Sequence, residues 1–234
     1  MTPLDADTHS RENLSFLARS EKRALIWIAR QLPEFVNSDH LSALGLVAMA
    51  LAGLSFAAYR LSPWAAAGVV VSLAANWFGD SLDGTLARVR GQQRPRYGFY
   101  VDHVVDVAGT TFLVAGMAGS GLMNPVVALV ALVLFLAVSA ESYLATHAVG
   151  VFRLAFLGFG PTELRMVIAI GAVKAAMSPW ATFGSFGHVK LFDLGGCVAS
   201  IGLVIAFLVA SIRNTRALYL AEPLPSRRRE SRAA

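Results

Sequence analysis

Long stretches without a charged residue constrain this chain most, because they reach the ~20 residues that a helix needs to cross a bilayer. Among them are Leu41 to Tyr59, Leu61 to Gly79 and Leu194 to Ile212. Only 15% of the 234 residues are charged, against about 25% in an average soluble domain, and the mean hydropathy is +0.57. The sequence therefore predicts a polytopic membrane protein and excludes an ordinary soluble globule. The lone Cys197 also excludes a disulfide scaffold.

Turn residues and charges divide the chain into six expected transmembrane helices, at about 41–59, 63–88, 97–117, 126–148, 161–178 and 194–212. The fifth is the weakest, because Arg165 and Lys174 leave it a short uncharged interior. We therefore expect an all-α integral membrane protein with three parts: an N-terminal cytoplasmic segment (1–38), a six-helix transmembrane domain (39–213) and a basic, disordered cytoplasmic tail (214–234).

The segment before the first span predicts an amphipathic helix. Between Ser10 and Leu32, leucine and isoleucine residues recur at helical spacing, with lysines and arginines on other faces. Because the basic residues and Trp27 favour an anionic interface, we expect this juxtamembrane helix to lie on the membrane surface. The alternative is a solvated helix that packs against the rest of the protein.

The basic residues predict the topology. Most of the 20 lysines and arginines lie before the first span, in the 79–98 loop, in the 149–165 segment or in the tail. The positive-inside rule then places both termini and the 79–98 loop in the cytoplasm. The tail is interpreted as a topology signal that contacts anionic lipid, and no nucleic-acid partner is expected. The short chain favours a bacterial cell membrane.

Four aspartates are concentrated at the cytoplasmic ends of the second and third expected spans. Asp80 and Asp83 are three residues apart, and Asp102 and Asp106 are four apart, so each pair projects from one face of its helix. The two helices are antiparallel neighbours, so the pairs can converge. Ionisable groups at membrane depth cost at least ~2.5–3.5 kcal/mol each and are functional candidates by default.

Four converging carboxylates would repel one another unless they were partly protonated or surrounded cations. An oxygen-only ligand set favours Mg²⁺ or Mn²⁺ over zinc or copper. Two such ions would suit phosphoryl transfer, because they clamp the attacking and leaving oxygens. His103 adjoins Asp102 but points about 100° away on a helix, so we interpret it as structural.

Small residues flank the acidic stripe. Gly84 and Gly98 remove a side chain next to the aspartates, and Ala87 keeps the same face narrow. Arg88 then places a fixed cation suited to a diphosphate. The alternative is that these small residues only allow close helix packing.

The complete pattern resembles the signature of the CDP-alcohol phosphotransferase family, class I. That signature reads D-x-x-D-G-x-x-A-R, a short spacer, then G-x-x-x-D-x-x-x-D. Every specified position is filled here, at Asp80, Asp83, Gly84, Ala87, Arg88, Gly98, Asp102 and Asp106. The resemblance in architecture covers about 33–213.

The resemblance implies a membrane enzyme that moves a substituted phosphate from a CDP-linked lipid, such as CDP-diacylglycerol, to an alcohol and releases CMP. By this analogy the four aspartates hold two divalent cations, and Asp106 is also the general base. Gly84, Ala87, Arg88 and Gly98 would line the CDP site. The family also implies a homodimer.

The acceptor site is expected among arginines on the cytoplasmic side. Arg153 and Arg165 are the favoured ligands of an acceptor phosphate, whereas Arg94 and Arg96 are at least as well explained by topology and lipid contact. Glu141 would line a polar cavity or pair with an arginine such as Arg165.

Several alternatives stay open at the level of the sequence. A cation transporter would explain the aspartates but not the glycine, alanine and arginine pattern. A silent relative of the family is disfavoured because no motif position is lost. Within the enzyme reading, the donor could be CDP-choline or CDP-ethanolamine with diacylglycerol as acceptor. The acceptor of a CDP-diacylglycerol enzyme is open among glycerol 3-phosphate, inositol phosphate, inositol, serine and a phospholipid.

Overall fold

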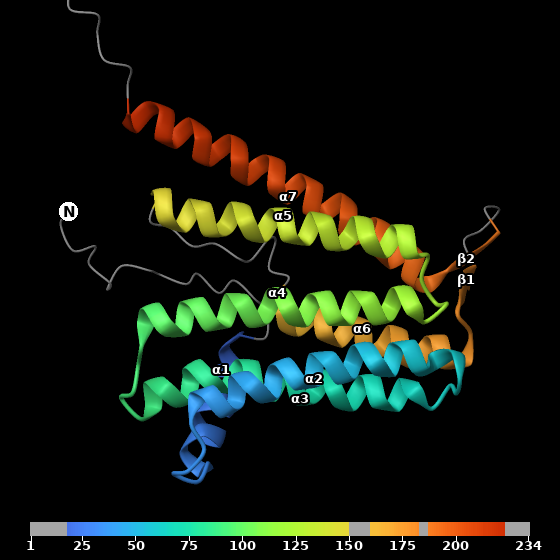
Figure 1. Ribbon diagram of the computed structural model, residues 1–234, viewed down its shortest axis with the longest axis horizontal. Helices are drawn as coiled ribbons and strands as arrows, with labels where there is room; N and C mark the ends of the chain where they lie inside the picture. Colours follow the sequence, from blue (N-terminus) through green and yellow to red (C-terminus); the bar gives the residue numbers. More distant parts are fainter. Residues whose placement is uncertain (1–17, 150–159, 183–186, 223–234) are drawn as a thin grey trace, which may run out of the picture.

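The computed structural model describes residues 18–149, 160–182 and 187–222, which form helices and one short hairpin (Figure 1). The elements are α1 (Ala18–Gln31), α2 (Ser38–Ala57), the 3₁₀ turn η1 (Ala58–Arg60), α3 (Ala65–Val89), α4 (Pro95–Gly119), α5 (Pro125–Val149), α6 (Pro161–Met177), β1 (Trp180–Thr182), β2 (His188–Lys190) and α7 (Leu191–Ala221). The antiparallel pair β1–β2 joins α6 to α7. Apart from this hairpin, the secondary structure of the described residues is therefore helical.

Five of the helices are long and apolar enough to cross a membrane, namely α2 with η1, α3, α4, α5 and α7. The fifth expected span, 161–178, corresponds to α6, which has 17 residues and so a length of only about 26 Å at 1.5 Å per residue. Pro161 begins α6, and Arg165 and Lys174 lie within it. The multi-pass architecture is confirmed, whereas a sixth span is not.

The helix α1 packs on the bundle. Leu25 and Ala29 are buried against a cluster that includes Leu82 and Leu86 of α3. This is the arrangement that the sequence left as the alternative to a helix lying on the membrane. Trp27 points outward and is 66% exposed, so a membrane contact of that face stays a prediction. Residues 10–17 of the expected helix lie outside the described residues.

A single carboxylate ties α1 to two other helices. Glu21 Oε1 accepts a hydrogen bond of 2.7 Å from Trp77 Nε1 of α3 and one of 2.9 Å from Thr162 Oγ1 of α6. At its other end α6 is held by Tyr59, whose hydroxyl donates to the carbonyl oxygen of Ala172. The short helix α6 is therefore fixed against the bundle near both ends.

Glycines bring α2 into backbone contact with its neighbours. A Cβ at Gly53 of α2 would overlap the carbonyl of Phe112 in α4, and a Cβ at Gly116 of α4 would overlap the backbone of Gly53. On the other side of α2, a Cβ at Gly79 of α3 would lie 2.5 Å from the carbonyl oxygen of Leu41. Small residues at helix contacts are the usual means of close packing in membranes. The helices α2, α3 and α4 therefore form one tightly packed unit.

A second unit pairs α5 with α7 (Figure 1). At the hairpin end, Asp193 of α7 accepts a 2.5 Å hydrogen bond from the backbone N–H of Asn124, and Lys190 Nζ donates to the carbonyl oxygen of Gly121. Both contacts hold the turn before α5. The helix α7 runs to Ala221, past the expected domain boundary at 213, because no glycine or proline lies between that boundary and Pro223.

The backbone contact between α2 and α4 predicts a large effect of one added methyl group. Gly116→Ala should lower the thermal unfolding midpoint of the protein in detergent, because overpacking of this kind costs about 1–3 kcal/mol or more. The matched control is Gly202→Ala, where the added Cβ has no atom within 4 Å. Equal midpoints for the two variants would show that the contact does not limit stability.

Candidate active site

The structure brings the four aspartates together at one end of the bundle. Asp80 and Asp83 lie on α3, and Asp102 and Asp106 lie on α4. All four are partly buried, and Asp106 interacts electrostatically with each of the other three. Asp83 likewise interacts with Asp80 and Asp102. The i, i+3 and i, i+4 spacings therefore do place both pairs on facing sides of the two helices.

The start of α2 holds Asp83. The Ser42 hydroxyl donates a 2.6 Å hydrogen bond to Asp83 Oδ2, and the Ser38 hydroxyl donates to the Asp83 carbonyl oxygen at 2.8 Å. The other carboxylate oxygen accepts from the backbone N–H of Gly84 at 2.5 Å. Both oxygens of this carboxylate are therefore oriented by neighbouring protein groups.

Arg165 reaches from α6 to the acidic cluster. Its Nη2 lies 2.5 Å from Asp80 Oδ2, and its Nε donates a 2.7 Å hydrogen bond to Asn76 Oδ1. Asn76 is 4% exposed, and its own Nδ2 donates to the carbonyl oxygen of Gly45 at 3.0 Å. Arg165 also interacts electrostatically with Asp106. The guanidinium therefore compensates part of the negative charge of the cluster.

Arg94, another acceptor candidate, lies away from Asp80. Arg153 lies outside the described residues. Arg94 forms an exposed ion pair of 2.5 Å with Asp39, and its guanidinium lies 4.0 Å from the centre of the Tyr97 ring. The hydrogen bond to Asp39 raises the pKa of the Arg94 side chain above its ordinary value. Besides its expected role in topology, Arg94 therefore has a structural role, because its ion pair with Asp39 links the start of α2 to the start of α4.

Glu141 does not pair with Arg165. Its Oε1 accepts a 2.7 Å hydrogen bond from Asn214 Nδ2 of α7. The predicted pair between Glu141 and Arg165 is therefore wrong, because Arg165 pairs with Asp80 instead.

Gly84, Ala87, Arg88 and Gly98 lie beside the aspartates on the same two helices. Arg88 is exposed, its Nη2 donates to Thr85 Oγ1 at 3.1 Å, and its guanidinium lies over Gly84. A Cβ added at Gly98 would meet no atom within 4 Å. Close helix packing therefore does not require the glycine at 98, and the backbone there is open to a ligand.

The donor set fits a hard divalent cation, because four carboxylates converge from two facing helices. Within residues 18–149, 160–182 and 187–222, however, no group of three or more His, Cys, Asp or Glu side chains is arranged as a ready-made metal site. Asp80 and Asp83 are turned toward Arg165 and Ser42. Metal ligation by all four would require new side-chain orientations at these two positions.

His103 is buried between aromatic rings. Its ring centre lies 4.1 Å from that of Phe99 and 4.7 Å from that of Tyr143, and it is 6% exposed. Its Nδ1 lies 3.6 Å from Asp102 Oδ2. The imidazole thus packs α4 against α5, in agreement with a structural role.

Comparison with known families decides the general class. The sequence model of the CDP-alcohol phosphatidyltransferase family matches residues 39–209. The chain belongs to this family. No curated protein matches it closely enough to count as a relative. The chain is therefore a transferase, whose family moves a phosphatidyl group from a CDP-alcohol, and the enzyme interpretation is favoured over a cation transporter.

Sequence reasoning missed three polar residues that organise this end of the transferase. Asn76 lies one helical turn before Asp80, so its position on the acidic face could have been noticed. Ser42 could not, because its partner Asp83 is 41 residues away. Arg90 was counted only for topology, yet its guanidinium donates to four backbone carbonyl oxygens between α1 and α2, those of Leu32, Pro33, Glu34 and Val36.

The contact between Asn76 and Arg165 should be measurable as a coupling energy. Asn76→Ala, Arg165→Ala and the double variant form a cycle, and a hydrogen bond to a charged group predicts a coupling of about 1.5–3 kcal/mol. Unfolding of the detergent-solubilised protein by denaturant would give the three values. Strictly additive effects would contradict the interaction.

Proposed function

We propose that this transferase moves a phosphatidyl group from a CDP-linked lipid, such as CDP-diacylglycerol, to the hydroxyl of a small polar alcohol and releases CMP. The observation that carries the proposal is the convergence of Asp80, Asp83, Asp102 and Asp106 at one end of the bundle, in a chain of this family. The reaction serves phospholipid biosynthesis.

The proposed step is a displacement at phosphorus. The acceptor oxygen forms a bond to the lipid-bearing phosphorus, and the bond from that phosphorus to the CMP oxygen breaks. CMP leaves with the electron pair, and a carboxylate oxygen of Asp106 takes the proton of the attacking hydroxyl. A positioned general base contributes a factor of about 10²–10⁴ to such a step.

Two divalent cations, Mg²⁺ or Mn²⁺, held by the four aspartates would supply neutralisation of the diphosphate charge. Arg88 would add a fixed positive charge to the same diphosphate. The open backbone at Gly98, and the small residues Gly84 and Ala87, leave room for the nucleotide next to α3 and α4. Arg165, already beside Asp80, is proposed to bind the acceptor phosphate together with Arg153.

The location of the site suits a lipid donor. The aspartates lie in the second half of α3 and the first half of α4, so the acyl chains can stay in the bilayer while the nucleotide reaches water. The distribution of basic residues supports a cytoplasmic site with both termini on the same side. A bacterial cell membrane and the homodimer of the family complete the proposal.

The reaction is tested by CMP release from purified protein in detergent with Mg²⁺ or Mn²⁺, CDP-diacylglycerol and a panel of acceptor alcohols. Asp106→Asn should lower turnover at least about 10²-fold while CDP-lipid binding is largely retained, because the amide cannot take the proton but still offers an oxygen ligand to a cation. Asp193→Asn, at the opposite end of the bundle, is the matched control and should keep full activity.

Two results would contradict this proposal. Retained turnover in Asp106→Asn would remove its role as general base. Absence of CMP release with every acceptor, from a folded protein that binds metal, would favour a CDP-choline or CDP-ethanolamine donor or a silent member of the family.

The acceptor assignment makes a separate prediction. Arg165→Ala should raise the KM of a phosphate-bearing acceptor about tenfold or more, because a charge-assisted contact to phosphate is lost, and should change the donor KM far less. Arg165→Lys should restore part of the acceptor affinity. Equal changes in both KM values would instead assign Arg165 to the orientation of Asp80.

A further inference from the structure

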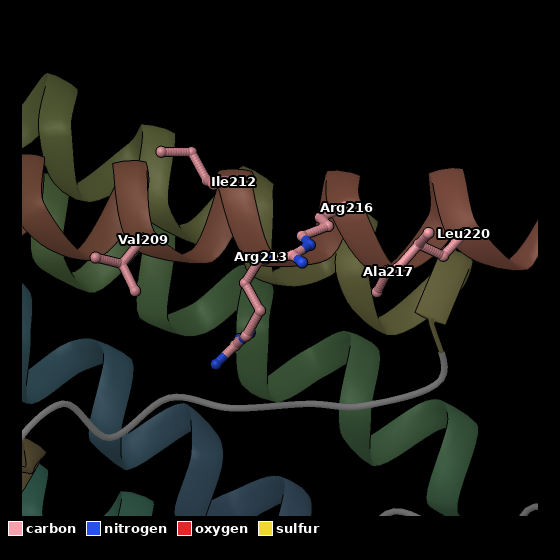
Figure 2. Close-up of a pocket in the computed structure, with 6 residues that line it drawn as sticks. All are labelled: Val209, Ile212, Arg213, Arg216, Ala217 and Leu220. Atoms are coloured by element: carbon pink, nitrogen blue, oxygen red, sulfur yellow. The ribbon is translucent and has the colours of Figure 1, made fainter.

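A groove lies along the C-terminal half of α7, outside the site described above (Figure 2). The predicted topology places this half of α7 on the cytoplasmic side. The groove has a volume of about 590 Å³. Its described lining residues follow one face of α7: Val209, Ile212, Arg213, Arg216, Ala217 and Leu220. Two arginines therefore stand in a groove whose other described walls are apolar, and Figure 2 shows the Arg213 side chain extending well away from its helix.

The position of these arginines along α7 places them at headgroup depth. The helix has 31 residues, and at 1.5 Å per residue it is roughly 46 Å long, whereas the hydrocarbon core of a bilayer is about 30 Å thick. Arg213 follows the uncharged stretch Leu194 to Ile212 directly. The two guanidinium groups therefore come where the apolar span ends.

Side-chain contacts place the two arginines at the same depth, independently of the length of α7. Asn214 of α7 bonds to Glu141 of α5, and two residues further along α5 the Tyr143 hydroxyl reaches the carbonyl oxygen of His103 at 3.5 Å. His103 adjoins Asp102. The arginines thus lie at the same level of the bundle as the acidic cluster, but on α7 instead of α3 and α4.

Neither arginine has an acidic partner among the described residues. The ion pairs of that part of the chain involve other residues, and the contact found for Arg213 is a 3.4 Å hydrogen bond from Nε to Asn214 Oδ1. Each guanidinium presents parallel N–H donors that match a phosphate, and the two arginines are three residues apart on one helix. Two cations without an acidic partner among the described residues, beside an apolar wall, favour an anionic ligand with an apolar body.

We propose that this groove binds a phospholipid with a net negative headgroup. The phosphate contacts Arg213 and Arg216, and an acyl chain lies against Val209 and Ile212, which continue the membrane-facing surface of α7. The ligand is a lipid of the surrounding leaflet and not the CDP-linked donor, since the donor's diphosphate belongs beside Arg88. The lipid site itself does not depend on the proposed reaction, whereas the exclusion of the donor rests on the proposed function.

The test uses the full chain in a neutral detergent, with dioleoylphosphatidylglycerol and dioleoylphosphatidylcholine as probes in native mass spectrometry. The wild-type protein should retain phosphatidylglycerol preferentially. The double variant R213Q/R216Q should lose about 10- to 100-fold in phosphatidylglycerol affinity, in line with two removed basic contacts, and should keep its phosphatidylcholine affinity. Ala217→Trp, which fills the groove without changing charge, should lower binding of both lipids.

The matched control removes two other exposed arginines, in the double variant R23Q/R30Q of α1. It carries the same charge change and should keep the phosphatidylglycerol affinity. An equal loss of phosphatidylglycerol affinity in the control would show that the lipid is attracted only by the overall positive charge of the protein, and would overturn the site. A wild-type protein without lipid preference would also overturn it, as would displacement of phosphatidylglycerol by CDP-diacylglycerol at stoichiometric concentration. Equal unfolding midpoints of the variants serve as the folding check.

Discussion

The mutual repulsion of four carboxylates at the edge of an apolar bundle is the constraint on which the arrangement of the site depends. Charged groups are expensive at membrane depth, and like charges close together add to that cost. Neighbouring groups compensate part of this charge: Arg165 pairs with Asp80, and the Ser42 hydroxyl and the Gly84 N–H donate hydrogen bonds to Asp83. The polar residues at this end of the bundle are explained by the acids that they contact.

The same constraint explains why α6, which is not among the five candidate spans, is nevertheless fixed in place. The contribution of α6 to the acidic cluster is one guanidinium, which Asn76, one turn before Asp80 on α3, also holds by a hydrogen bond. Glu21 and Tyr59 then attach the two ends of α6 to the bundle. An arginine on a separate helix can neutralise the charge of the aspartates from outside their helix face. An arginine on that face would instead occupy the space that a ligand needs.

Much of this could be predicted from local spacing. The positions of Asp80, Asp83, Asp102 and Asp106 depend on helical periodicity within two adjacent helices, and the apolar stretches fix those helices. The pairing of Asn76 with Arg165, across 89 residues, could not, because nothing in the spacing specifies which faces of α3 and α6 meet. The packing of α1 was left between two alternatives for a related reason: an amphipathic face predicts burial but not whether lipid or protein covers it. The continuation of α7 to Ala221 shows that a change in charge does not end a helix when no residue breaks it.

The glycine contacts of α2 have a mechanical consequence. Where backbone lies against backbone, as between Gly53 and Gly116, there is no side chain whose rotamer change could absorb a displacement. The helices α2, α3 and α4 must then move as one body, and the spacing between the two aspartate pairs is fixed by backbone contacts through α2 more than by side-chain packing. Movements that open or close the site around a substrate would then involve α6 or the pair α5 and α7. These helices contact the unit of α2, α3 and α4 through individual hydrogen bonds and ring contacts.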